Sequence, residues 1–97
     1  MKSLTRESFE PCLRQRFSIN LPEVKLTAEL VEVKPLGQPF QEGAREPFSL
    51  LFEADAAHGL LNQGTYSLVN EVLGEREIFL VPVGERDNCY QYEAIFN

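Results

Sequence analysis

Side chains that could do chemistry are few in this chain of 97 residues. Its single histidine, His58, would have to serve any Ser-His or Cys-His nucleophilic system. Asp55 lies three residues earlier and could orient the imidazole ring, but no serine stands in a Gly-x-Ser-x-Gly motif. We therefore interpret His58 as a solvated loop histidine, predict no catalytic residue, and expect a protein that is not an enzyme.

Metal and phosphate binding are also poorly supported by the residue spacing. Cys12, His58 and Cys89 each stand alone, whereas a metal site needs several ligands at workable spacing, so we predict no metal and no cofactor. The segment 59–65 has two glycines five residues apart, as in a phosphate-binding loop, but the lysine before Thr65 is missing. We interpret the two cysteines as buried thiols, with a disulfide between them as the alternative.

The charge of the chain bears on its partners. Fifteen acidic and nine basic residues give a formal net charge of −6, which repels phosphate backbones and anionic lipids, so we expect neither nucleic acid nor membrane as a partner. The first thirteen residues include four charged side chains and lack the apolar stretch of a secretory signal. We therefore expect a cytoplasmic protein, and no apolar run approaches the roughly 18 residues that a membrane span needs.

Apolar residues recur at every second position through most of the chain, which is typical of half-buried strands. The apolar residues lie at even positions up to Leu30 and at odd positions from Val31 onward. One extra residue in a strand causes such a shift, so the sequence predicts a β-bulge at Leu30-Val31. Near the N-terminus, Thr5 is a predicted N-cap of a helix that begins at Arg6 and ends by Leu13, since Pro11 breaks it. The predicted strands cover residues 16–21, 24–34, 48–53, 65–72, 78–83 and 90–96.

These elements predict one all-β domain over residues 1–97. Six strands and one short helix leave no room for helical crossovers between parallel strands, so the sheet must be mainly antiparallel. A small six-stranded barrel or a two-sheet sandwich follows, with the short helix at its N-terminus. We prefer the barrel, because closure removes the two edges that an open sheet would expose.

Several short motifs occur together along the chain: Leu4-Thr5-x-x-x-Phe9, the strand at 47–52, Gln63-Gly64-Thr65-Tyr66, Leu73-Gly74, the strand at 79–83, and the ending Tyr92-Glu93-Ala94-Ile95-Phe96-Asn97. With these the chain resembles a family of uncharacterised short bacterial proteins, a domain of unknown function whose members end in Tyr-Glu-Ala-Ile/Val-Phe-Asn. The resemblance covers nearly the whole chain and implies a small β-domain, intracellular or associated with phage tails. It implies no catalytic residues.

We expect a non-enzymatic assembly or protein-interaction module, phage- or tail-associated, that docks on another protein or on a second copy of itself as a homodimer. Apolar residues on the second face of the strands need cover that one short helix can only partly give. This interaction surface comprises Leu51, Val69, Phe79, Val81 and Ile95.

The alternative function is small-molecule binding by the barrel. In that case the loops at 35–45 and 55–64 form the mouth of a ligand site, since loops on a rigid sheet commonly carry function. The polar contacts to the ligand would come from Arg45, Asp55 and His58.

The last strand should be held on both sides, because Tyr92, Ala94 and Phe96 have the spacing of core-facing residues. Deletion of residues 94–97 should therefore abolish the cooperative unfolding transition in a thermal or urea melt followed by circular dichroism. A truncated chain that melts like the full chain would contradict this prediction.

Overall fold

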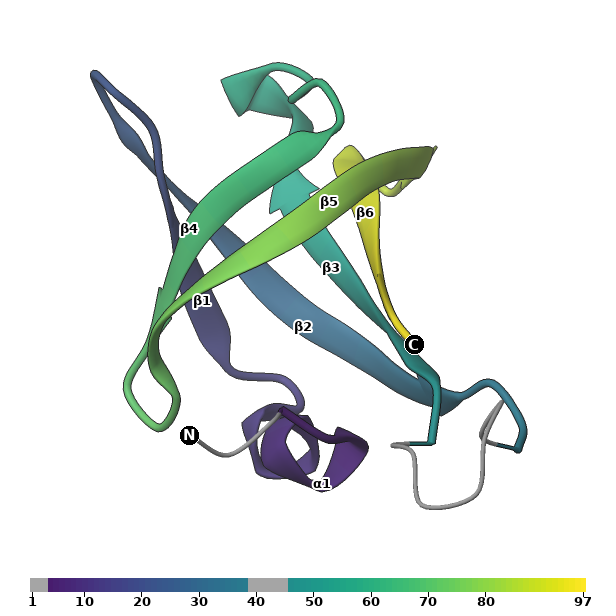
Figure 1. The fold of residues 1–97 in the computed structure, drawn as a ribbon. Coiled ribbons are helices and arrows are strands. Elements are labelled where there is room, and N and C mark those ends of the chain that lie inside the picture. Colours follow the sequence, from purple (N-terminus) through teal and green to yellow (C-terminus); the bar gives the residue numbers. More distant parts are fainter. Residues whose placement is uncertain (1–3, 39–45) are drawn as a thin grey trace.

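Six antiparallel strands close into a barrel in the computed structural model, which describes residues 4–38 and 46–97 (Figure 1). Around the barrel the strands follow the order β1-β2-β3-β6-β5-β4. The predicted all-β antiparallel class is thus confirmed, with the barrel rather than the sandwich as its architecture. The strand bounds are β1 (Arg16–Asn20), β2 (Lys25–Pro35), β3 (Phe48–Asp55), β4 (Gly64–Asn70), β5 (Gly74–Arg86) and β6 (Cys89–Phe96).

Two seams join strands that are distant in sequence and close the barrel. The seam between β3 and β6 pairs all eight residues of each strand, from Phe48 opposite Phe96 to Asp55 opposite Cys89. The seam between β1 and β4 has three residue pairs, with Ile19 opposite Leu68 at its centre. The β1–β4 seam is therefore the shortest of the strand interfaces.

Inward-facing side chains fill the barrel, as the alternation of apolar residues predicts. Phe17 and Phe52 meet edge to face with their ring centroids 5.1 Å apart. Ala28 stands opposite Ala54 on adjacent strands, and such small side chains leave room for the large rings. Other buried residues of the interior are Ile19, Leu26, Leu30, Leu50, Leu68, Ile78, Leu80, Tyr92 and Ala94.

A short helix lies at one end of the barrel, where α1 (Arg6–Phe9) continues into a 3₁₀ turn, η1 (Glu10–Cys12) (Figure 1). The ring of Phe9 is buried, with its centroid 5.9 Å from that of Phe48 and 5.5 Å from that of Phe96. Phe48 and Phe96 stack with centroids 4.7 Å apart. Three aromatic rings therefore pack together where the helix covers the barrel.

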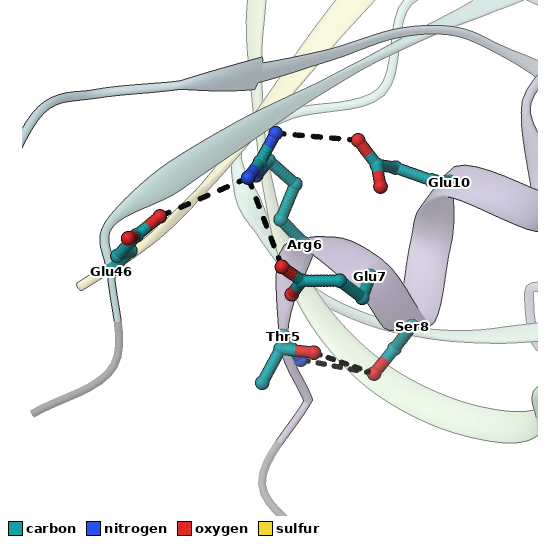
Figure 2. A network of polar contacts seen from close by, with 6 residues as sticks. All are labelled: Thr5, Arg6, Glu7, Ser8, Glu10 and Glu46. Atoms are coloured by element: carbon teal, nitrogen blue, oxygen red, sulfur yellow. Dashed lines mark hydrogen bonds and ion pairs between the residues drawn. The ribbon is translucent and has the colours of Figure 1, made fainter.

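Polar contacts begin the helix and connect it to the sheet (Figure 2). The backbone N–H of Thr5 donates to Ser8 Oγ at 3.1 Å, and the Ser8 N–H donates to the Thr5 carbonyl at 3.0 Å, which confirms Thr5 as the N-cap. The Arg6 guanidinium lies 3.4 Å from Glu10 and 3.9 Å from Glu46, just before β3. Ion pairs at the surface contribute little to stability, so these contacts add only modestly to the packing of the helix.

Two irregularities bend the strands. The register between β2 and β3 shifts between Leu30 and Glu32, which confirms the predicted bulge. A second shift lies between Pro82 and Gly84 in β5, and we did not predict it from the sequence. Both increase strand twist, which helps a small sheet to close.

Several predicted strand bounds were wrong. β3 ends at Asp55 rather than Glu53, β5 ends at Arg86 rather than Val83, and the bounds on both sides of the β4–β5 turn also differ. β5 begins at Gly74 rather than Ile78, because the polar residues 75–77 pair with β4 right up to the hairpin turn. β4 ends at Asn70 rather than Val72, because the Asn70 side chain accepts hydrogen bonds from the turn that follows. Backbone pairing and a side-chain cap override the local apolar pattern at both positions.

Asn70 reinforces the short β1–β4 seam. Its Oδ1 atom accepts from the backbone N–H groups of Val72 at 2.8 Å and Leu73 at 3.2 Å, which fixes the β4–β5 turn. Its Nδ2 atom donates to the Arg16 carbonyl and to Gln15 Oε1, both at 3.1 Å. Backbone pairing between β1 and β4 stops before Asn70, and the side-chain amide then continues the connection to β1.

Asn70→Ala should lower the free energy of unfolding by about 2–4 kcal/mol, because part-buried backbone groups on both sides of the seam lose their partner. Asn20→Ala is the matched control. Asn20 sits at the other end of the same seam with one long contact of 3.5 Å to Ser67 Oγ, so its replacement should cost less than about 1 kcal/mol. Urea denaturation measures both, and equal losses would contradict the role assigned to Asn70.

Candidate functional site

The residues predicted for a loop-formed ligand site have mainly local structural surroundings. Arg45 lies outside the described residues. Asp55 is the N-cap of a second 3₁₀ turn, η2 (Ala56–His58), where its Oδ1 atom accepts from the Ala57 N–H at 2.9 Å. His58 ends this turn and is exposed to solvent. The Asp55 carboxylate is therefore already engaged in capping the turn.

Two tyrosines fix the loop that follows η2. The hydroxyl of Tyr92, which rises from the barrel interior, accepts from the Leu61 N–H at 2.9 Å. The hydroxyl of Tyr66 donates to the Asn62 carbonyl at 2.6 Å. Burial raises the pKa of the Tyr92 hydroxyl. The loop is thus anchored over the barrel end opposite the helix (Figure 1).

An exposed apolar group beside this loop was missed by sequence reasoning. Leu60 and Val83 are exposed, and with the half-buried Pro82 and Tyr90 they line a shallow, open hollow of about 410 Å³. Leu60 lies in a stretch without periodicity, and Val83 was predicted as an ordinary strand residue. No sequence signal joins the two, because they meet only through the tertiary fold.

Four of the five predicted surface residues lie on adjacent strands. Phe79 and Ile95 are 52% and 56% exposed, and Leu51 and Val81 are half-buried. In the strand registers Leu51 and Val81 flank Glu93 from opposite sides. We name Leu51, Phe79, Val81 and Ile95, on the outer side of β3, β5 and β6, the outer apolar face.

Val69 lies apart from the outer apolar face. It belongs to β4 and pairs with Glu75, four residues along β5 from Phe79. Its side chain is 36% exposed and borders a separate open hollow of about 510 Å³. The other residues that line this hollow are Gln15, Arg16, Ser18, Asn70 and Glu71.

The strands that carry most of the outer apolar face are acidic. Residues 64–97 contain six acidic and two basic side chains, a net charge of −4 out of the −6 of the whole chain. One of the two basic residues, Arg86, lies 3.6 Å from Asp87. A partner that meets this side of the barrel therefore encounters apolar side chains within a negative field.

Both cysteines are free thiols. Cys12 is buried, as predicted, and burial raises its pKa. Cys89 is half-buried, so the prediction of full burial was wrong for this residue. Its pKa is raised by burial first and then by carboxylates that include Glu53 and Asp55. A raised pKa keeps both thiols protonated and poorly nucleophilic at neutral pH.

Within residues 4–38 and 46–97, no three His, Cys, Asp or Glu side chains are grouped as metal ligands. Nor does the described part of the chain contain a helix of the length and apolarity that crossing a membrane requires. The buried side chains of Asn70 and Tyr92 use their polar atoms to hold the seam and the loop.

Fold and surface together define a small closed β-barrel with a filled interior, a tethered loop and an apolar outer face. A family model described as "Domain of unknown function (DUF6916)" matches residues 4–96, and the chain belongs to this family. This confirms the resemblance to a family of unknown function that the sequence motifs indicated. Comparison with curated proteins and with solved structures found no match.

Tyr92→Phe should lower the free energy of unfolding by about 1 kcal/mol at pH 7, because the Leu61 N–H loses its acceptor. The raised pKa also predicts a pH dependence. The pKa of Tyr92 is higher in the folded state than in the unfolded state, so above about pH 10 the unfolded chain loses the Tyr92 proton first. The stability contributed by neutral Tyr92 is therefore lost as the pH rises through the folded-state pKa. Tyr92→Phe should therefore lose less stability than the wild type between pH 9 and pH 11.

Tyr90→Phe is the control for the value at pH 7, since Tyr90 is half-buried beside the same loop but its hydroxyl has no hydrogen bond among the described residues. It should change stability by less than about 0.5 kcal/mol. Identical pH slopes for the wild type and Tyr92→Phe in urea denaturation would refute the assignment.

Proposed function

We propose that this protein is a non-enzymatic protein-interaction module that binds its partner through the outer apolar face. The observation that carries the proposal is the exposure of Phe79 and Ile95, each more than half accessible, on the neighbouring strands β5 and β6. Neither is needed to complete the core, because inward-facing residues already fill the barrel.

Interface anatomy supports this assignment. Leu51 and Val81 extend the apolar area across three strands, and the half-buried Glu93 between them supplies a polar contact. Full burial of a Phe or Ile side chain contributes about 1.5–3 kcal/mol, and aromatic residues are common at interface centres. Phe79 and Ile95 are therefore the residues best placed to anchor a partner.

The surroundings of the polar residues favour binding over catalysis. Asp55 caps η2, and the buried Asn70 and Tyr92 hold backbone groups in place. A small-molecule site would have to lie outside the filled barrel, at the loop end where Asp55 and His58 stand, and this alternative stays a prediction. A cytoplasmic location and an association with phage tails likewise stay predictions from the sequence.

Photo-crosslinking in the native host tests the proposal. Benzoylphenylalanine at position 79 or 95 should give a discrete protein adduct, identified by mass spectrometry, with the mass of a dimer if the partner is a second copy. The same group at position 24 is the control, because Val24 is 53% exposed but lies in the β1–β2 turn. Absence of any discrete adduct at both 79 and 95 would exclude an interface at the outer apolar face.

A further inference from the structure

The first half of β5 has an edge without a neighbouring strand. Residues Gly74 to Leu80 pair with β4 on one side. The register with β6 on the other side covers Val81 to Arg86. Figure 1 shows β5 and β6 diverging from their hairpin towards the end of the barrel where α1 lies. Among the residues that the structure describes, no strand pairs with this edge of Gly74–Leu80, which we name the β5 edge.

Along the β5 edge, residues 74–77 are all exposed, and buried and exposed side chains alternate from Ile78 onward. Ile78 and Leu80 point inward and are buried. Glu75, Glu77 and Phe79 point outward and are exposed, so two carboxylates precede the aromatic ring of the outer apolar face. A strand placed beside this edge would thus meet negative charge along one part of its length and apolar surface along the next.

We infer that the β5 edge binds an extended segment of a partner protein in which basic and apolar residues alternate. This inference rests on the proposed function and names the chemistry of its partner. An extended segment adds to a free edge through backbone hydrogen bonds, and its alternate side chains supply specificity. Basic residues opposite Glu75 and Glu77 form cross-strand pairs of opposite charge. The apolar residues that alternate with them lie on the face of the strand that carries Ile78 and Leu80.

In the registers centred on Arg76 and on Glu77, the charge pattern disfavours a second copy of this chain at the same edge. Two-fold antiparallel pairing of β5 centred on Arg76 sets Glu75 opposite Glu77, and pairing centred on Glu77 sets that residue against itself. Like charges directly opposite each other destabilise a strand pair. Charged edge residues commonly prevent such self-pairing, and here the same carboxylates select a basic segment.

Fluorescence anisotropy with the full chain and labelled nine-residue peptides tests the inference. A peptide in which Lys alternates with Val should bind at least about tenfold more tightly than one in which Glu alternates with Val. General attraction to an acidic protein would give the same preference. The decisive probe is therefore the Lys-Val peptide N-methylated at alternate amides, which keeps its charge but loses its strand hydrogen bonds, and it should bind at least about tenfold more weakly.

Charge substitutions then locate the binding site. Glu77→Lys should weaken binding of the Lys-Val peptide about tenfold, and Glu77→Gln should weaken it less. Glu85→Lys is the matched control, because it makes the same charge change in the part of β5 that pairs with β6, and it should leave binding within about twofold. A thermal melt of each variant checks that it is folded. If Glu77→Lys is unfolded, Glu77→Gln is used in its place to locate the binding site.

The inference fails if the N-methylated peptide binds as well as its parent, if Glu85→Lys weakens binding as much as the Glu77 variants, or if no peptide binds at 1 mM. If the peptide experiment fails but photo-crosslinked adducts still form at positions 79 and 95, the outer apolar face is an interface that does not use strand addition. Failure of both experiments would remove the proposed function as well.

Discussion

Closure of the barrel depends on a short contact between β1 and β4. Three residue pairs form its backbone ladder, and the Asn70 side chain then extends the connection to the Arg16 carbonyl. The Cys12 thiol also lies 3.5 Å from Asn70 Oδ1, so the turn after the helix meets the same amide. Without this seam β1 and β4 would both be edge strands, and the core between them would open to water.

Because the barrel is closed and filled, the proposed partner binding lies on its outer surface. Rings such as Phe17 and Phe52 occupy the interior, and three further rings pack under the helix. The buried polar side chains hold the fold together, which leaves exposed apolar residues and surface charge as the features available to a partner. Phe79, Val83 and Ile95 are exposed on β5 and β6, and residues 64–97 carry a net charge of −4.

Much of the fold was predictable because strand faces are local properties. Alternation in β3 and β6 correctly separated inward residues such as Phe52 and Ala94 from outward ones such as Ile95. The phase slip at Leu30-Val31 correctly located a bulge. The polar start of β5 escaped prediction, because residues 75–77 are held in the strand by pairing with β4 rather than by their own pattern.

The sequence by itself determined the all-β class, the faces of the strands and the acidic surface, because alternation and charge can be counted along the chain. Only the tertiary structure decided which strands meet. It grouped Leu51 with Ile95, placed Val69 on another side, and brought Tyr92 under the loop at Leu61. Those contacts join residues some 30 to 50 positions apart, and no local preference of the backbone specifies such a pairing.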